Sequence, residues 1–269
     1  MSRLKEQIKE VYSGIVLDND AIHGCCTPVG YKNVACCGPT SENIGFSEDY
    51  SRVPGYIPEA DFGLGCGTPV AFSGIENAQT VLDLGSGAGN DAFVARSLVG
   101  ENGRFIGVDF TPEMIEKANS NKDKLGYNNI DFLLGDIENL PLLDNSVNVV
   151  ISNCVVNLVP DKLAAFREIH RVLKPKGHFC ISDIVLTGEI TVKMKSVIEL
   201  YAGCISGAMV KSDYLHAIKS AGFNDVEIKT EKTLQLSDDY LIQYLTKSEL
   251  SDYRNSGSQV LSITVVGKK

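Results

Sequence analysis

The sequence predicts an α/β fold, a mostly parallel seven-stranded sheet with helices on both faces. Three observations carry this prediction. From Thr80 onward, short apolar runs of strand length alternate with helical patterns, as in parallel sheets with crossover helices. A glycine-rich turn, Gly85–Gly89, follows the first of these runs. The 269 residues are 43% apolar and 22% charged, which suits one large domain with a substantial core.

The apolar runs place five strands in order, each followed by a turn or a helical pattern. Strands are predicted at 80–85, 104–109, 130–134, 147–152 and 178–183, and helices near 90–99, 112–124 and 161–173. Thr111 and Pro112 are suited to the N-cap and first turn of the second of these helices. Gly177 is expected to follow the third helix and to end it.

After Asp183 the pattern changes to a helical insertion and two closing strands. The insertion is expected around 191–206, and a helix near 212–221 is expected to begin with Ser212 as its cap. A strand near 223–229, a helix near 237–247 and a final strand at 259–267 complete the chain. These two strands bring the predicted sheet to seven.

The N-terminal part carries one short amphipathic helix and then a long segment without periodicity. The helix is predicted over 2–12, because four apolar residues share one of its faces: Leu4, Ile8, Val11 and Tyr12. From residue 13 to about residue 61 the pattern fades, and a connection of this length is usually functional or mobile. The segment Gly63–Pro69 then places a cysteine between glycines, with its proline suited to the first position of a helix.

Charge and hydropathy exclude several classes of protein. The formal net charge is −9 and no basic stripe is visible, which argues against a nucleic-acid partner. No stretch approaches the ~18 apolar residues of a membrane span, and the polar start of the chain does not match a secretory signal. We therefore expect a cytoplasmic protein whose eight cysteines are reduced thiols. Eight such thiols need an explanation other than a disulfide framework.

The stretch TVLDLGSGAGND, Thr80–Asp91, combines a buried strand, a glycine turn and the start of a helix. Backbone N–H groups and the positive end of a helix dipole meet there, and glycine lets a ligand approach the main chain. A dinucleotide site would need its third glycine at the position of Asn90. The spacing instead resembles motif I of class I S-adenosylmethionine-dependent methyltransferases; a nicotinamide site and a structural turn are the alternatives. The motif consists of Asp83, Gly85, Gly87 and Gly89.

Further polar residues stand at the carboxyl ends of the predicted strands, where parallel sheets bind ligands. Asp109 ends the second strand, 20 residues past the last glycine, where an acid can accept both ribose hydroxyls. Asp136 follows the third strand and is expected to accept the adenine amino group, with the backbone N–H of Ile137 meeting a ring nitrogen. Both acids have the alternative interpretation of turn formers. Asn153 lies at the end of the fourth strand, beside the expected reacting centre.

Three cysteines from distant parts of the chain are expected to converge over the methyl donor. Cys66 lies in the glycine loop before the first strand, Cys154 at the end of the fourth strand, and Cys204 in the insertion. Taken singly, a cysteine is more often a small buried hydrophobe, and we keep that interpretation for Cys180. Three converging thiols indicate a thiophilic centre. Zinc is the alternative, but no Cys-x2-Cys pair exists and zinc favours four ligands. The four histidines are not arranged as a general base.

Six segments in this order closely resemble bacterial arsenite S-adenosylmethionine methyltransferases: GLGCGTP, VLDLGSGAG, FIGVDFTPEMIEKA, ISNCVVNLVPDK, FREIHRVLKPKG and LYAGCISGA. The likeness runs from Cys36–Cys37 to about residue 230. It implies a Rossmann-like class I fold with an antiparallel closing pair of strands, and S-adenosylmethionine as the cofactor. Carried over position by position, it implies that Cys66, Cys154 and Cys204 hold trivalent arsenic, the substrate.

The resemblance also implies how such an enzyme turns over. Cys36 or Cys37 would form a disulfide with Cys66, and thioredoxin or glutathione would reduce it. Arsenic bound by three thiolates keeps a lone pair that can attack the methyl group, so no general base is needed. Two departures from the family stand out. The additional pair Cys25–Cys26 has no assigned role, and we expect no separate C-terminal domain.

These inferences divide the chain into two parts and leave three hypotheses for its function. Residues 1–70 are expected to form the N-terminal helix and a mobile cysteine-rich segment that contributes to the acceptor site. Residues 71–269 are expected to form the methyltransferase domain, with an acceptor-binding insertion at about 185–210. The leading hypothesis is a monomeric enzyme that methylates arsenite for detoxification. The alternatives are a methyltransferase of a small organic acceptor and a non-catalytic metalloid or metal binder.

Overall fold

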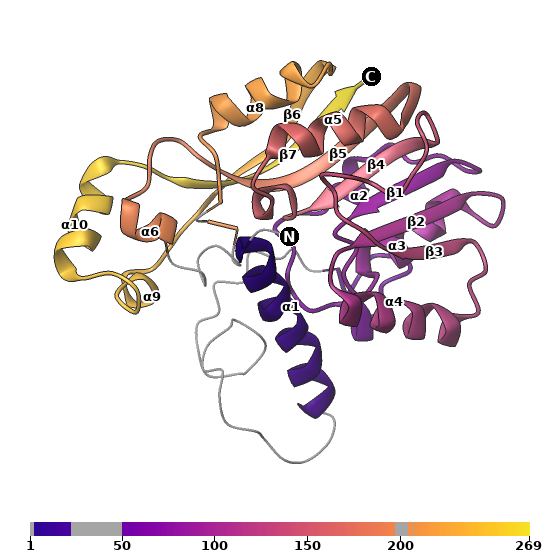
Figure 1. Cartoon of the computed structure of the whole chain (residues 1–269), viewed down its shortest axis with the longest axis horizontal. Helices are drawn as coiled ribbons and strands as arrows, with labels where there is room; N and C mark the ends of the chain where they lie inside the picture. Colours follow the sequence, from indigo (N-terminus) through magenta and orange to yellow (C-terminus); the bar gives the residue numbers. More distant parts are fainter. Residues whose placement is uncertain (1–2, 23–49, 197–203, 206) are drawn as a thin grey trace.

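A computed structural model describes residues 3–22, 50–196, 204–205 and 207–269 (Figure 1). Within these residues seven strands form one sheet in the order β3-β2-β1-β4-β5-β7-β6. Strands β1 to β5 pair in parallel, and β7 runs antiparallel to both β5 and β6. The predicted α/β fold is confirmed. The strands are β1 Thr80–Leu84, β2 Arg104–Asp109, β3 Ile130–Leu134, β4 Val147–Asn153, β5 Leu173–Leu186, β6 Asn224–Leu234 and β7 Val260–Lys268.

Helices cover both faces of this sheet. Helices α5 and α8 pack on one face through residues such as Phe166 and Tyr214, while α3 and α4 pack on the other through Phe93 and Met114 (Figure 1). The elements are α1 Arg3–Ile22, η1 Pro58–Ala60, α2 Pro69–Phe72, α3 Asn90–Val99, α4 Pro112–Leu125, η2 Val156–Leu158, α5 Lys162–Val172, α6 Val192–Ser196, α8 Lys211–Ser220, α9 Asp238–Leu241 and α10 Lys247–Ser256. Thr111 is the N-cap of α4, and Pro112 and Pro69 begin their helices as predicted.

Successive residues of the central strand β1 contribute side chains alternately to the hydrophobic cores on the two faces of the sheet. Leu82 and Leu84 are fully buried under α5 and α8, whereas Val81 is fully buried on the side of α3. This period of two follows from the pleat of a strand, and it explains why the strand reads as a continuous apolar run. Burial of each such side chain stabilises the fold by about 1.5–3 kcal/mol.

A third hydrophobic cluster lies apart from these two faces and contains Cys66, Cys154 and Cys204. Its other members include residues of α1, η2, α6, α9 and α10 and of β5 and β7, among them Ile8 and Tyr253. The cysteines therefore sit in apolar surroundings built by segments far apart in the sequence.

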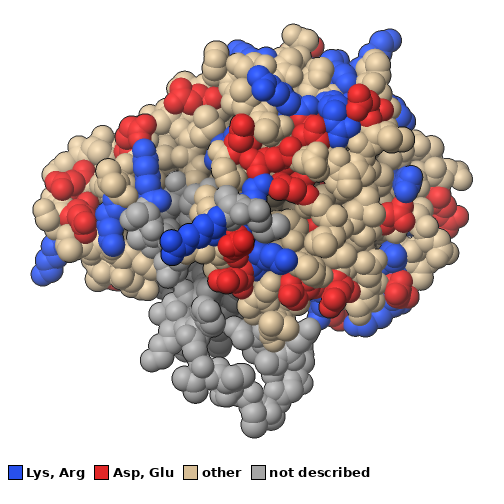
Figure 2. All heavy atoms as spheres, viewed as in Figure 1, with Lys and Arg blue, Asp and Glu red and all other residues tan. Residues whose placement is uncertain are grey.

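Surface charges of both signs are interspersed on the face shown in Figure 2, and this face carries no continuous basic stripe among the coloured residues. In the described part of the chain, no helix combines the length and apolarity that crossing a membrane requires.

Helix α1 is longer than predicted. It runs from Arg3 to Ile22, so the expected loss of structure at residue 13 is wrong. Ile15 and Val16 continue the apolar stripe and are buried in the core cluster of α3 and α4. This packing outweighs the roughly 1 kcal/mol that Gly14 costs inside a helix.

The boundary between α5 and β5 also differs from the prediction. The helix ends at Val172 and the strand begins at once with Leu173, so Gly177 lies inside β5 and does not end the helix. Leu173 pairs with Val147, and a register shift follows before the regular ladder starts at His178. An irregular segment of this kind inserts residues into a strand and has no periodic signal in the sequence.

The predicted cap of α8 is wrong as well. Ser212 is the second residue of the helix, and Val210 is the N-cap. Val210 forms an isolated parallel bridge with Leu186. This contact holds the backbone extended up to the residue before the helix, so tertiary pairing sets the start.

The C-terminal third has more structure than the pattern indicates. The single helix predicted near 237–247 is replaced by α9 and α10, separated by a turn. Strand β6 extends five residues past the predicted end because Thr233 and Leu234 pair with β7. In the predicted insertion, α6 is present, and residues 197–203 and 206 lie outside the described residues.

A capping box is expected to stabilise α10. Thr246 Oγ1 accepts from Glu249 N at 3.3 Å, and a Glu249 carboxylate oxygen accepts from Thr246 N at 2.8 Å. Thr246→Ala should lower the free energy of unfolding by about 1 kcal/mol in urea titrations, because it exposes helix N–H groups without a partner. The exposed neighbour Ser248→Ala is the control, and equal losses in both variants would contradict the assignment.

Candidate functional site

An open cavity lies beyond the carboxyl ends of the central strands. This is where ligands bind in open parallel sheets. Seven of the eight predicted cofactor residues line it, and Gly89 lies instead at the N-cap of α3. Cys154 also lines the cavity. The lining residues from the prediction are Asp83, Gly85, Gly87, Asp109, Asp136, Ile137 and Asn153.

The glycine turn has the backbone conformation that only glycine adopts freely. Gly85, Gly87 and Gly89 have φ of +65°, +51° and +98°. At Gly85 a side chain is also excluded by space, since a Cβ would lie 2.3 Å from Val155. The turn packs directly against the segment that follows Cys154, so the cofactor and cysteine parts of the site share one wall.

Asp109 is tied to this turn. Its carboxylate accepts from Gly87 N at 3.0 Å and from Thr111 N at 2.8 Å. Burial raises the pKa of Asp109, and these N–H donors act in the opposite direction. The side chain is thus fixed at the end of β2 on the cavity wall, the position from which the ribose role was predicted.

Asp136 has a partner that the sequence did not indicate. Its Oδ2 accepts from Lys5 Nζ of α1 at 2.5 Å, and Lys5 also pairs with Glu138. Lys5, Ile8 and Tyr12 line the cavity, so one face of α1 covers the end where adenine recognition is predicted.

Two residues missed by the sequence analysis, Tyr50 and Asp91, form a buried polar network with Asn153. Tyr50 donates to Asp91 Oδ1 at 2.6 Å, and Asn153 Nδ2 donates to Asp91 Oδ2 at 3.2 Å. Burial raises the pKa of Asp91 to about 6, with both donors lowering it. Burial and the charges of Asp91 and Asp109 raise the pKa of Asp83. Asp91 could have been suspected from its place at a helix start, whereas Tyr50 lies in a stretch without any pattern.

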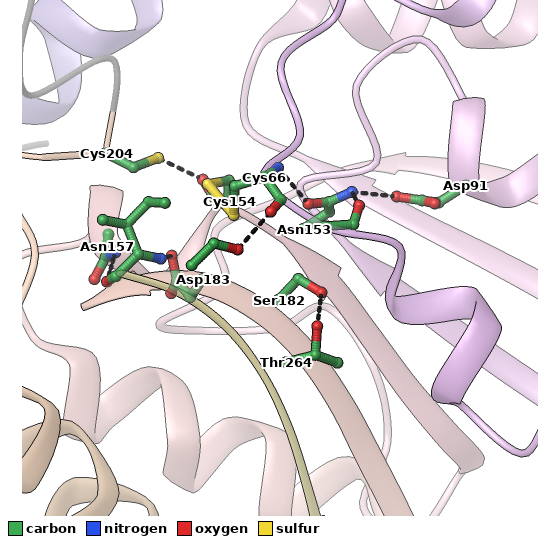
Figure 3. Close-up of a disulfide and its surroundings, with 12 residues drawn as sticks. Cys66, Asp91, Asn153, Cys154, Asn157, Ser182, Asp183, Cys204 and Thr264 are labelled. Atoms are coloured by element: carbon green, nitrogen blue, oxygen red, sulfur yellow. Dashed lines mark hydrogen bonds between the residues drawn. A yellow bond between two sulfur atoms is a disulfide. The ribbon is translucent and has the colours of Figure 1, made fainter. Parts of the chain in front are cut away.

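The structure brings the three predicted cysteines together (Figure 3). Cys66 and Cys154 form a disulfide with their Cα atoms 5.8 Å apart, and the thiol of Cys204 donates to the carbonyl of Cys154 at 2.9 Å. The expectation that all cysteines are thiols is therefore wrong for Cys66 and Cys154, because the fold places them within the usual disulfide separation. Cys36, Cys37, Cys25 and Cys26 lie outside the described residues.

Two of these cysteines hold unusual backbone conformations. Cys154 and Cys204 have φ of +62° and +63°, in the left-handed region. Such a conformation costs a non-glycine residue of the order of 1 kcal/mol or more and often marks a functional position. With Cys66 and Cys154 joined, the described residues hold no group of three Cys, His, Asp or Glu side chains arranged to bind a metal ion.

A second buried polar cluster influences Cys204. Burial raises the pKa of the Cys204 thiol, Asp183 raises it further, and Lys162 lowers it. Tyr214 donates to Asp183 Oδ2 at 3.1 Å. Burial raises the pKa of Asp183 to about 7. Lys162 Nζ donates to the carbonyls of Asn157 and Val159, which fixes η2 beside the cysteines.

Cys180 is a buried side chain as predicted, and His170 and His178 contact other parts of the fold. Cys180 is a fully buried free cysteine on β5. Among the described residues no histidine lines the cavity. His170 packs its ring against Phe223, and His178 lies 2.5 Å from the carbonyl of Ser73.

Comparison with known proteins decides the family. Residues 75–222 match a family model described as a methyltransferase domain. The chain belongs to the class I methyltransferase family. A nicotinamide site is thereby excluded as the interpretation of the glycine turn, and S-adenosylmethionine is the cofactor of this family.

Several proteins similar to this chain are named arsenite or arsenic methyltransferases. The methyltransferase is 43% identical to an arsenite methyltransferase of Halobacterium salinarum over 87% of this chain, and 33% identical to one of Aquipseudomonas alcaligenes over 87%. It spans 61% and 66% of the length of these relatives. It resembles the crystal structure of an arsenic (III) S-adenosylmethionine methyltransferase from Chlamydomonas reinhardtii, with 37% identity and a TM-score of 0.65 over 76% of this chain and 67% of that one.

The wall of the cavity carries polar atoms of the kind that S-adenosylmethionine needs for binding. Ser86 Oγ and Asn90 Oδ1 are buried on its wall without a hydrogen-bond partner among the described residues, so polar atoms are available to a ligand. Gly85 and Gly87 line the cavity without a side chain between their backbone and the ligand space. A charged amino-acid group and a nucleoside need polar contacts of this kind.

Asp109→Asn should weaken S-adenosylmethionine binding at least about tenfold, since a charge-assisted hydrogen bond contributes about 1.5–3 kcal/mol. Isothermal titration calorimetry on the reduced protein measures the dissociation constant. Asp131→Asn, a change of an exposed acid on the adjacent strand β3, is the control. Equal affinities for wild type and Asp109→Asn would contradict the ribose role.

Asp183 should make stability fall as pH rises. Its pKa is about 7 in the folded protein and near 3.8 in the unfolded chain, so between these values only the folded state holds the proton. The free energy of unfolding should therefore decrease from pH 4 to pH 7, by about 4 kcal/mol at most from this group. Asp183→Asn should remove that decrease in urea titrations, and parallel curves for both proteins would contradict it.

Proposed function

We propose that this methyltransferase transfers methyl groups from S-adenosylmethionine to trivalent arsenic, presented as arsenite or its thiol conjugate, for arsenic detoxification. One observation carries the proposal: Cys66 is bonded to Cys154, the Cys204 thiol contacts the Cys154 carbonyl, and Cys154 lines the cofactor cavity. The names of the two curated relatives and of the Chlamydomonas structure support the choice of substrate.

In this proposal the three cysteines bind arsenic as thiolates. Arsenic is a soft centre that prefers sulfur ligands. The apolar cluster around the cysteines keeps water from the reacting centre. No proton has to be removed from the acceptor, which agrees with a cavity whose described lining contains no histidine.

Asp109, Asp83 and the glycine turn hold the cofactor in this scheme, with Asp136 and Ile137 at its adenine. When bound, S-adenosylmethionine supplies an electrophilic methyl group and retains the electron pair of the broken sulfur–carbon bond. Asn153 lies between the two halves of the site, because it precedes Cys154 in the chain and contacts the loop of Cys66.

The disulfide between Cys66 and Cys154 must be opened before arsenic can bind both sulfurs. Two external thiols would be oxidised to one disulfide as Cys66 and Cys154 gain two electrons and two protons. Methylation then takes arsenic from the trivalent to the pentavalent state. Two electrons return it, and we propose that Cys66 with Cys36 or Cys37 delivers them and that thioredoxin or glutathione restores these thiols. We further propose that the enzyme works as a cytoplasmic monomer.

Removing one sulfur should abolish the reaction. Cys154→Ala and Cys204→Ala should each lower arsenite methylation by about a hundredfold or more, because each removes a ligand of the reacting atom. Chromatographic speciation of arsenic after incubation with S-adenosylmethionine and a thiol measures the product. Cys180→Ala is the matched control, since it removes a buried free cysteine outside the trio, and its rate should stay within about twofold of wild type.

Undiminished methylation by the Cys154 and Cys204 variants would refute arsenic binding by the trio. If wild type produces no methylated arsenic, a screen of small organic acceptors with labelled methyl donor tests the alternative enzyme. Absence of S-adenosylmethionine binding in calorimetry would refute both.

A further inference from the structure

Asn153 connects the cysteine loop to the start of helix α3. Its Oδ1 accepts from the backbone N–H of Cys66 at 2.9 Å. Its Nδ2 donates to the carbonyl of Gly67 at 2.9 Å. It also donates to Asp91 Oδ2 at 3.2 Å (Figure 3). One amide therefore reaches Cys66 on one side and a carboxylate on the other.

The orientation of this amide decides whether Cys66 is held. The two ends of an amide have nearly the same shape, so the surrounding hydrogen bonds choose between them. The ionised Asp91 carboxylate and the Gly67 carbonyl can only accept, so both require the NH₂ end of Asn153 to face them, and the carboxylate adds a charge-assisted contact. In the reverse orientation the amide oxygen would face Asp91 and the Gly67 carbonyl, and the NH₂ would face the N–H of Cys66.

Tyr50 fixes Asp91 in turn. Its hydroxyl donates to Asp91 Oδ1 at 2.6 Å and lies 3.2 Å from the carbonyl of Gly67. Tyr50 is buried, with 4% of its surface exposed, so these contacts are shielded from water. The loop is packed tightly as well, since a Cβ at Gly65 would lie 2.6 Å from Asn153 Nδ2.

We propose that Asp91 is a positioning residue for Cys66: through Asn153 it holds the Cys66 backbone where the Cys66 sulfur reaches Cys154. The backbone carbonyl of Cys66 is held separately by Ser262 Oγ at 2.6 Å, so the N–H contact supplies the second of two fixed points. The consequence for turnover rests on the proposed function, whereas the positioning itself concerns only groups of this chain. The competing role for Asp91, which lines the cavity, is a direct contact with the cofactor.

The equilibrium between Cys66 and Cys154 measures the positioning without arsenic. The protein is equilibrated with reduced and oxidised glutathione, where two glutathione thiols become one glutathione disulfide as the protein disulfide becomes two thiols. Acid quenching, alkylation and peptide mass spectrometry give the fraction of Cys66–Cys154 disulfide. Asp91→Asn should lower the equilibrium constant for the disulfide about tenfold, the effect of losing about 1.4 kcal/mol of orientation. Asp131→Asn should leave it unchanged.

A double-mutant cycle tests whether Asp91 acts through Asn153. Asn153→Ala alone should lower the same constant, and adding Asp91→Asn should lower it no further, because the link is already cut. Additive effects would overturn the proposal. Tyr50→Phe should act in the same direction by about threefold, and it keeps the test decisive if Asp91→Asn does not fold.

Cofactor affinity separates the two roles of Asp91. The dissociation constant of S-adenosylmethionine should change by less than about threefold in Asp91→Asn, while KM for arsenite rises more than kcat falls. A tenfold weaker cofactor affinity with an unchanged disulfide equilibrium would overturn the proposal. A wild-type enzyme inactive on arsenite would refute the proposed function and leave the glutathione experiment valid.

Discussion

The register of β1 between β2 and β4 is the constraint on which the site depends. Leu84 pairs with Val108 on one side and with Ser152 on the other, so the residues that follow these three positions emerge at one level. They are Gly85, Asp109 and Asn153. A slip by one residue in either pairing would turn one of these groups to the other side of the sheet. The cofactor wall and the anchor of the cysteine loop are therefore both products of strand pairing.

The parts of the site governed by this register were predictable from the sequence, and the parts governed by side-chain packing were not. Gly85 and Gly87 follow β1 and Asp109 ends β2, two strands with clear apolar runs, so their place on the cavity follows from topology alone. Tyr50 and Lys5 reach the site from segments whose positions depend on tertiary contacts. The local periodicity of the sequence does not indicate such contacts. The early start of β5 and the cap of α8 were missed for the same reason, because a strand irregularity and a single bridge fix them.

Buried polar groups connect the halves of the site at a cost in stability. Asp83, Asp91 and Asp183 are each at least nine-tenths buried, and burial raises the pKa of each. A buried carboxylate is tolerated when donors surround it, as Tyr50 and Asn153 surround Asp91. The donors are also the groups that carry the loop of Cys66, so the same hydrogen bonds satisfy the charge and set the geometry. Burial of the large apolar cores on both sheet faces offsets the free energy that it costs to bury these carboxyl groups.

The left-handed backbone at Cys154 and Cys204 places two opposing demands on the same positions. Selection for a stable chain alone would favour glycine or asparagine at both, because these residues adopt that conformation with little strain. Only a sulfur side chain serves a thiophilic ligand. Under the proposed function, replacing either cysteine by glycine would relieve the backbone strain and remove a ligand of arsenic, so binding and local backbone strain impose opposite requirements on these two positions.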